Sequence, residues 1–234
     1  LLAAQLGARL AERFAIDVPL GVLFEQPTIA AQAAWIEGEL RRAPGAELVR
    51  VGDGPAPLSF AQERLAFARR RAPDAPEPKL RFALRLDGAL DRGRLEAAMV
   101  AVADRHPALR TVFTGDGSAA RQRVVGACVR DHLDDDARGA PAASHAARLR
   151  AHLDDERARP FALAAGPPWR TRLVRLADDA HVLIVTLHHY VSDGISVQVW
   201  LDEVDAHYRA LATGAAPDVP ALTASPLDVA VWQR

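Results

Sequence analysis

Hydrophobic and polar residues follow two different periods along this chain. An apolar residue at every third or fourth position is typical of one helix face, and this spacing predicts helices over residues 2–16, 28–36, 91–106, 142–159 and 196–212. Alternation of apolar and polar residues is typical of strands, and it predicts strands over 81–86, 122–125, 169–176 and 181–189. A turn at 177–180 joins the last two strands into a β-hairpin. Residues 131–138 are polar and are predicted to form a loop, so the whole pattern indicates an α+β fold.

Three segments divide the chain. Residues 1–42 carry only helical signals, with Thr28 as an N-cap, and taken alone they indicate a small helical subdomain. Residues 43–56 are rich in proline and glycine and are predicted to be a linker. Residues 57–234 mix helices and strands, and their first helix begins at Ser59 with Gln62 three positions on, which is a capping-box pattern.

Composition narrows the classes of function. The net charge is −1, which gives no electrostatic reason to expect binding to nucleic acid or to a membrane surface. Cys128 is the only cysteine, which excludes an internal disulfide and favours a reducing cytoplasm. No apolar run reaches the length of a membrane span, and no signal peptide is recognisable. The chain begins without Met inside a helical pattern, so we expect a piece of a longer protein.

The residues with the clearest chemistry follow the last predicted strand, in the sequence Leu187-His188-His189-Tyr190-Val191-Ser192-Asp193-Gly194. Neighbouring side chains on a strand point to opposite faces, so one histidine is expected to face a cavity while the other is packed behind it. The same divergence makes joint binding of one metal ion unfavourable, although a metal site or a hydrogen-bonded core cluster stays an alternative to catalysis. Asp193 needs a partner if it is buried, and Gly194 permits a tight backbone or the close approach of a substrate.

Two other histidines lie within one predicted helix. His145 and His152 are seven residues apart and therefore lie close to one helix face. A metal site needs more than this pair, and no third ligand is spaced with them. They are predicted to be solvated helix residues.

The His-His-x-x-x-Asp-Gly pattern at 188–194 resembles the signature of condensation domains of nonribosomal peptide synthetases, and more widely of chloramphenicol-acetyltransferase-like acyltransferases. Four further segments are similar to motifs of the same family: Ser59–Leu65, Arg105–Phe113, Pro160–Pro167 and Leu227–Arg234. Two positions depart from the family pattern, with Ala66 in place of an aromatic residue and Ile195 in place of tryptophan. Epimerization domains share the paired histidines, whereas cyclization domains replace the first one with aspartate.

The first 42 residues resemble the C-terminal part of a peptidyl carrier domain, through Leu1–Leu6 and Pro19–Ile29. In that family a serine directly ahead of the leucine-rich helix bears a 4′-phosphopantetheine arm. That position falls just before Leu1, so the serine is not in this sequence. The resemblance therefore implies a carrier remnant followed by the N-terminal lobe of a condensation domain, which is a chloramphenicol-acetyltransferase-like α/β sandwich lobe.

The resemblance also implies roles for five residues. His189 is expected to act as the base or the positioning group for the attacking amine, and the Gly194 amide to donate toward the developing oxyanion. His188, Asp193 and Arg105 are expected to support the site structurally, with Arg105 paired to Asp193. No metal is expected. Peptide-bond formation is the implied reaction, and the residues before the glycine resemble the type that joins an L donor to an L acceptor.

The implied partners are an upstream and a downstream carrier domain, an adjacent adenylation domain and the missing C-terminal lobe of the condensation domain. Because that second lobe completes the channel in the family, the chain alone is expected to have little or no activity. Three alternatives stay open: a non-catalytic carrier-docking module, an epimerization domain, and a coenzyme A-dependent acyltransferase with the same motif.

Overall fold

The structure, a computed structural model, describes residues 2–41, 48–126 and 131–234. The chain forms two compact units, Leu1–Glu47 and Leu48–Arg234. The domain boundaries inferred from the sequence stay predictions. Residues 43–47 of the predicted linker lie outside the described residues, and so does Cys128. Within the described ranges, no helix has the length and apolarity needed to cross a membrane.

The first unit contains three helices, α1 (Leu2–Phe14), α2 (Leu20–Glu25) and α3 (Ile29–Leu40), of which the first and the third were predicted. Thr28 caps α3 as predicted, because its side-chain oxygen accepts a hydrogen bond from the Ala31 amide at 3.2 Å. Leu23 and Ile36 are buried in this unit. A Cβ at Gly7 would lie 3.3 Å from Leu23 Cδ1, which shows how closely α1 approaches α2.

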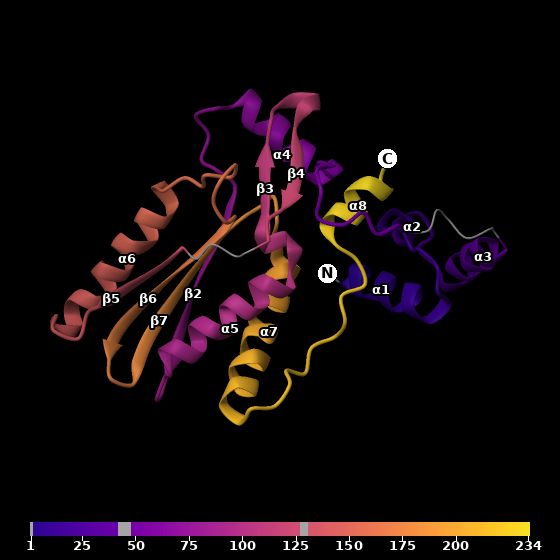
Figure 1. Cartoon of the computed structure of the whole chain (residues 1–234). Coiled ribbons are helices and arrows are strands. Elements are labelled where there is room, and N and C mark those ends of the chain that lie inside the picture. The colour runs from indigo at the N-terminus through magenta and orange to yellow at the C-terminus, as the bar shows by residue number, and fades with distance from the viewer. Residues whose placement is uncertain (1, 42–47, 127–130) are drawn as a thin grey trace. The chain divides into compact units, whose positions relative to one another are not determined.

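The second unit is built on a mixed sheet with the strand order β2-β7-β6-β5 (Figure 1). The strands are β2 (Lys79–Asp87), β5 (His132–Asp136), β6 (Trp169–Ala177) and β7 (Ala180–His188). Strand β7 is central and pairs antiparallel with both β2 and β6, whereas β5 pairs parallel with β6. The predicted hairpin at 169–189 and the predicted strand at 81–86 are therefore confirmed.

Helices cover both faces of this sheet, as Figure 1 shows. Helices α5 (Arg92–Arg105) and α7 (Gly194–Thr213) pack on one face, where they bury the odd-numbered β7 side chains Leu183, Val185 and Leu187. Helix α6 (Ala142–Ala158) packs on the other face, against Ile184 and its neighbours. Because β7 is buried on both faces, it is a continuous apolar run that ends at the two histidines.

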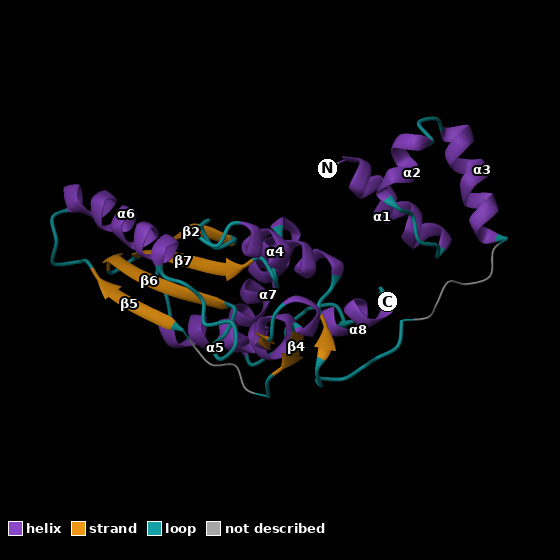
Figure 2. Ribbon diagram, turned by 90° about the horizontal axis from the view of Figure 1, so that it is seen from above, coloured by secondary structure: helices purple, strands orange, loops and turns teal. Residues whose placement is uncertain are grey.

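A smaller sheet with the order β1-β4-β3 accompanies the first. It comprises β1 (Ala56–Pro57), β3 (Thr111–Thr114) and β4 (Arg121–Val124), and the short helices η1 (Pro107–Arg110) and η2 (Gly117–Ala119) flank β3. Helix α4 (Phe60–Arg71) follows β1, and α8 (Pro226–Trp232) packs on β1 (Figure 2). Ala56, Val124 and Leu227 form the core of this region.

The first and last segments of the second unit are held together by hydrogen bonds. The Val51 amide donates to Asp228 Oδ1 at 2.8 Å, and Arg234 donates to the carbonyl oxygen of Leu58 at 3.0 Å. The Phe60 amide donates to the side chain of Gln233 at 3.0 Å. Residues 51–60 and 228–234 therefore lie side by side, although about 170 positions separate them along the chain.

One secondary-structure prediction was wrong. Residues 131–138 were expected to form a loop, but His132–Asp136 is the edge strand β5. The run of charged residues lacks the apolar alternation by which a strand is predicted. Asp134 and Asp136 are exposed and form ion pairs with arginines at the surface. Asp135 faces α6, where Arg148 forms an ion pair with it and the His152 ring contacts it.

Candidate active site at the end of strand β7

His188 is the last residue of β7 and is 1% exposed. Its Nδ1 accepts a hydrogen bond from the Tyr190 amide at 3.0 Å, so the ring proton of the neutral form lies on Nε2. The ring packs edge-on against Phe161 and Tyr190, with centroid distances of 5.9 and 4.6 Å. Burial lowers the pKa of His188 to about 4 because water no longer stabilises the charged form. His188 is therefore a neutral, packed residue, as expected.

His189 lies one residue beyond the strand, on a turn, and is half-buried. Its amide donates to the carbonyl oxygen of Pro78 at 3.0 Å. Its Nδ1 lies 3.0 Å from the carbonyl oxygen of Ser192. Because a carbonyl can only accept, the neutral ring carries its proton on Nδ1 and presents a lone pair on Nε2. The two histidines differ in burial, and the turn rather than strand alternation separates them; that one of them faces a cavity stays a prediction.

The turn after His189 is closed by its own hydrogen bonds. The Val191 amide and the Ser192 hydroxyl both donate to the carbonyl oxygen of His188, at 3.1 and 3.0 Å. Ser192 is buried, so this arrangement is shielded from competing water. The turn therefore holds the His189 ring in a defined position relative to the end of the sheet.

Asp193 caps helix α7. Its Oδ1 accepts from the Ser196 amide at 2.8 Å and from the Ser196 hydroxyl at 2.7 Å, while the Asp193 amide donates back to that hydroxyl at 3.2 Å. The Ser196 hydroxyl lowers the pKa of the Asp193 carboxyl below its usual value, because it stabilises the charged form. This cap starts α7 two residues earlier than the helix that we predicted from the sequence.

Gly194 is the first residue of α7 and is exposed. Its φ lies outside the left-handed region, and nothing lies within 4 Å of the position that a Cβ would occupy. Neither the backbone nor the packing of this unit requires glycine, so the tight-backbone explanation is wrong. The close approach of a substrate to Gly194 stays a prediction.

The expected pairing of Arg105 with Asp193 is not formed. Arg105 Nε instead donates to Glu203 Oε2 at 3.0 Å, and the same oxygen lies 2.7 Å from Nε2 of His106. Helices α5 and α7 pack together, and the end of α5 that carries Arg105 lies beside Glu203 and not beside the start of α7. Ten residues of α helix separate Asp193 from Glu203, a rise of about 15 Å. Arg105 therefore braces the two helices and does not hold the histidine turn.

Gln62 contacts the histidine turn, which neither its capping-box pattern nor its place in the family-like segment Ser59–Leu65 predicted. The capping box with Ser59 is present, since Gln62 Oε1 accepts from the Ser59 amide at 2.8 Å. The amide group of Gln62 also donates to the carbonyl oxygen of Tyr190 at 2.9 Å and to Gln122 Oε1 at 3.1 Å. The residue is 5% exposed. Gln62 thus connects α4 to the turn that carries His189.

A cavity of about 280 Å³ lies beside the turn, between α5, η1 and α7. It is lined mainly by apolar side chains, among them Val102, Leu109, Val191, Ile195, Val199 and Trp200. Ile195 and Val199 are also exposed, so the apolar surface continues outside the cavity. The space next to the turn therefore suits an apolar group better than a charged one.

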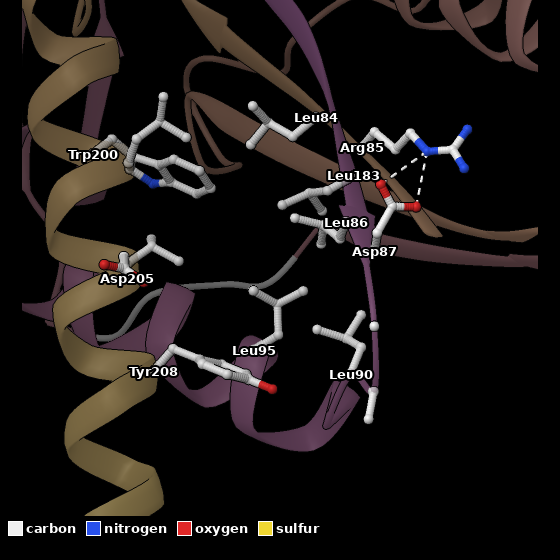
Figure 3. Close-up of a pocket in the computed structure, with 14 residues that line it drawn as sticks. Leu84, Arg85, Leu86, Asp87, Leu90, Leu95, Leu183, Trp200, Asp205 and Tyr208 are labelled. Atoms are coloured by element: carbon white, nitrogen blue, oxygen red, sulfur yellow. Dashed lines mark hydrogen bonds and ion pairs between the residues drawn. The ribbon is translucent and has the colours of Figure 1, made fainter. Parts of the chain in front are cut away.

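A second cavity of about 480 Å³ lies at the other end of β2 and β7 (Figure 3). Leu84, Leu183 and Trp200 point toward its interior, and the Arg85–Asp87 ion pair lies on the far side of β2. Leu183 precedes His188 by five strand residues, a rise of about 17 Å. This cavity is therefore remote from the histidine turn.

His145 and His152 were predicted to be solvated, but both are partly buried and their rings contact other residues. His145 Nε2 lies 3.2 Å from the carbonyl oxygen of Ala137, and His152 Nε2 lies 2.7 Å from Asp135 Oδ2. Both histidines therefore dock α6 onto the edge of the sheet. Across residues 2–41, 48–126 and 131–234, no group of three or more potential metal ligands is assembled.

A mixed sheet with helices on both faces and a His-His-x-x-x-Asp-Gly turn leading into a helix defines a lobe of the chloramphenicol-acetyltransferase-like class. Comparison with known families agrees. The sequence profile of the condensation domain matches residues 53–234, and that of the phosphopantetheine attachment site matches residues 1–36. The chain belongs to the condensation domain family of nonribosomal peptide synthetases and carries part of a carrier domain ahead of the lobe.

Relatives of known function are peptide synthetases. The chain is 31% identical over 237 residues to the dimodular nonribosomal peptide synthase of Bacillus subtilis, a match that covers 100% of the chain and 10% of the relative. It is 34% identical over 212 residues to phosphinothricin tripeptide synthetase PhsC of Streptomyces viridochromogenes, covering 91% of the chain and 19% of the relative. The chain thus spans a small part of these proteins.

Solved structures show the same fold. The X-domain in complex with OxyB from teicoplanin biosynthesis matches with a TM-score of 0.67 and 31% identity, over 82% of this chain and 41% of that one. The starter condensation domain of rhizomide synthetase matches with a TM-score of 0.67 and 24% identity, over 76% of this chain and 43% of that one. The chain therefore spans about two fifths of these solved domains.

The carrier segment does not contain an attachment point for phosphopantetheine. Residues 1–36 include no serine, and the hydroxyl of Thr28 in that range is engaged in capping α3. That the carrier serine falls before Leu1 stays a prediction. None of the residues in this segment therefore fits the role of carrying the phosphopantetheine group.

Proposed function

We propose that this lobe forms part of a condensation site that joins an upstream carrier-bound acyl or peptidyl thioester to the amine of a downstream carrier-bound aminoacyl group. The observation that carries the proposal is the Nε2 lone pair of His189, which faces away from the backbone bond made by Nδ1. Imidazole exchanges protons near neutral pH, so it suits an amine that must lose a proton. Family membership supports this function, since the relatives described above are peptide synthetases.

The reaction forms a carbon–nitrogen bond and breaks a carbon–sulfur bond. His189 Nε2 accepts a hydrogen bond from the attacking amine and takes its proton, or orients the amine while the proton leaves. The Gly194 amide, at the start of α7, donates toward the thioester oxygen as negative charge develops on it. The thiol of the upstream carrier is the leaving group and recovers the proton. Holding both tethered substrates at one point lowers the entropic part of the barrier.

Three residues support the site in this proposal without touching substrate. His188 is the packed wall behind the turn, and Asp193 holds the start of α7. Arg105 acts further away, by bracing α5 against α7 through Glu203. The apolar surface at Ile195 and Val199 faces substrate or the second lobe of the domain.

The partners are part of the proposal. They are the upstream and downstream carriers with their phosphopantetheine-bound substrates, an adjacent adenylation domain and the C-terminal lobe. We also propose a cytoplasmic location and an L-to-L stereochemical type, both on the sequence alone. Because the solved domains are more than twice as long as this chain's matching region, little or no turnover is expected from these 234 residues alone.

A second candidate function is a non-catalytic docking module. One observation favours it: the X-domain from teicoplanin biosynthesis, which matches this fold, was solved as a complex with OxyB. The presence of His189 with a free Nε2 favours catalysis over docking. An epimerization domain or a coenzyme A-dependent acyltransferase would share the motif, and the carrier segment at the N-terminus argues against the latter.

The deciding experiment uses a protein extended to contain the carrier serine and the second lobe. The upstream carrier is loaded with an aminoacyl group, an aminoacylated downstream carrier is added, and the intact masses of both are followed. Transfer of the upstream mass to the downstream carrier is expected in the wild type and lost in His189→Ala. His145→Ala is the matched control, because that histidine only docks α6. No transfer with both carriers shown to be loaded would reject condensation and favour docking.

A further inference from the structure

A buried carboxylate outside the recognised motifs lies directly behind the histidine turn. Glu77 is in the loop between α4 and β2, and its side chain is 8% exposed. It lies where four separate parts of the fold meet: the end of α4, the start of β2, the segment after α6 and the end of β7. Such a position is costly for a charged group unless every oxygen has a partner.

Every neighbour of the Glu77 carboxylate is a donor. Oε2 accepts from the Phe161 amide at 3.0 Å and lies 3.1 Å from Lys79 Nζ. Oε1 lies 3.5 Å from Arg69 Nη1 and 3.8 Å from His188 Nε2. Lys79 is 3% exposed, so its charge has little water around it. A glutamine at this position would have to turn its NH₂ group toward one of these donors, so the chemistry of the pocket is specific for a carboxylate.

The same loop contacts both histidines of the motif. The Tyr190 amide occupies Nδ1 of His188, which leaves the proton on Nε2, the nitrogen that faces Glu77. The next residue, Pro78, accepts the hydrogen bond from the His189 amide at 3.0 Å. Two consecutive residues therefore contact the two consecutive histidines, one through a side chain and one through the backbone.

We propose that Glu77 is a positioning residue of the condensation site: its carboxylate, 3.8 Å from His188 Nε2, holds the orientation of that ring and, through Pro78, the backbone of His189. The expected effect on kcat rests on the proposed function, whereas the effect on the histidine rings does not. Glu77 is not expected to touch substrate, because its side chain is buried and its carboxylate faces Lys79, Phe161 and His188. Its effect reaches the reaction through the position of His189 Nε2.

The test compares three variants by ¹H–¹⁵N spectra of the histidine rings in the 234-residue chain. Glu77→Gln removes the carboxylate but keeps the shape, and we expect the His188 ring signals and the His189 amide signal to shift, while the Tyr190 amide keeps His188 in its Nε2–H tautomer. Lys79→Met removes the neighbouring cation and is expected to leave the His188 signals unchanged. The double variant Glu77→Gln/Lys79→Met removes the unpaired cation that destabilises the single variant, and is expected to keep the altered His188 signals.

Asp135→Asn is the matched control, because Asp135 is also a carboxylate that contacts a histidine and an arginine, on the α6 side of the sheet. It is expected to leave the His188 and His189 spectra unchanged. Native spectra in the double variant would overturn the proposal, since Glu77 would then only neutralise Lys79. Altered His188 signals in Lys79→Met would overturn it as well.

The kinetic arm uses the extended protein with both carriers loaded. Glu77→Gln is expected to lower kcat by up to about 100-fold with little change in KM, because a misplaced catalytic group slows the chemical step. Asp135→Asn is expected to keep the wild-type kcat. An inactive wild type would reject the proposed function, and the ring spectra would still decide the role of Glu77. Full activity in Glu77→Gln would overturn the positioning role.

Discussion

Gln62 Nε2 donates to the carbonyl oxygen of Tyr190 at 2.9 Å, although the two residues are 128 positions apart in the sequence. The bond ties the first turn of α4 to the turn that holds His189. The second hydrogen of the same amide reaches Gln122, whose own amide donates to the carbonyl oxygen of Pro57 at 2.8 Å. The histidine turn is therefore anchored to the small sheet as well as to the large one.

Gln62→Glu is expected to destabilise the fold and the site together. The substitution preserves shape but replaces a donor with an acceptor, so a carboxylate oxygen faces two other acceptors. Leaving such buried groups unsatisfied costs about 1–3 kcal/mol, and urea unfolding measures it. We also expect a lower kcat for condensation. Gln198→Glu is the control, because Gln198 bonds only to Asp202 on the surface, and an equal loss in both variants would contradict the anchoring role.

His188 is expected to make folding less stable as the pH falls. The folded protein does not protonate this ring until the pH nears its pKa of about 4, whereas the unfolded chain binds the proton below about pH 6.5. The unfolded state therefore holds more protons between these values, and stability rises with pH across that window. The loss from pH 7 to pH 5 is about 2 kcal/mol, and there is no further gain above pH 7.

The charged groups around His188 are Glu77, Arg69, Lys79 and His189. His188→Gln removes only the titrating ring, so the difference between the wild-type and variant urea midpoints isolates its contribution. His181 and His207 also have a pKa lowered by burial, and they contribute equally to both proteins. Parallel pH profiles for wild type and variant would show that His188 is not buried as described.

A double-mutant cycle is expected to distinguish the two candidate partners of Arg105. Arg105→Ala and Glu203→Ala remove the two sides of an observed contact of 3.0 Å, and residues in contact couple by about 0.5–3 kcal/mol. Arg105→Ala and Asp193→Ala are expected to be additive within about 0.5 kcal/mol, because the residues share no contact. Free energies of unfolding supply both cycles. Strong coupling in the second cycle would restore the pairing that the family suggested.

Asp193→Ala is expected to cost about 1 kcal/mol of folding free energy, because it removes the N-cap of α7. Asparagine caps helices about as well as aspartate, so Asp193→Asn is expected to keep most of the stability and most of the kcat. Thermal unfolding and the carrier assay measure the two quantities. A variant Asp193→Asn that folds normally but has lost turnover would show that the charge itself takes part in the reaction.

Local patterns in the sequence predicted most of the fold. Alternation indicated the hairpin at 169–189, and Asp91 and Thr28 marked the starts of helices that the structure confirms. These signals depend on neighbours within about four residues, so they can be read without knowing the tertiary structure. Strand β5 was missed because its aspartates are satisfied by arginines and a histidine from other elements.

The site was predictable in part for the same reason. The motif located the histidine turn, since all of its residues are consecutive. Glu77 and Glu203 were missed, and so was the bond from Gln62 to Tyr190, because each acts across a long sequence separation and each residue type is common on helix and loop surfaces. The partner of Arg105 depends on how far α5 slides along α7, which no local pattern records.

The pairing of residues 51–60 with residues 228–234 has a practical consequence for engineering synthetases. Hydrogen-bonded partners that lie far apart in the sequence are best taken from the same parent protein when domains are exchanged. Grafting points for this lobe should therefore be chosen outside both segments, so that the bonds from Val51 to Asp228 and from Arg234 to Leu58 travel with it. A junction placed between the two segments would separate these hydrogen-bonded partners.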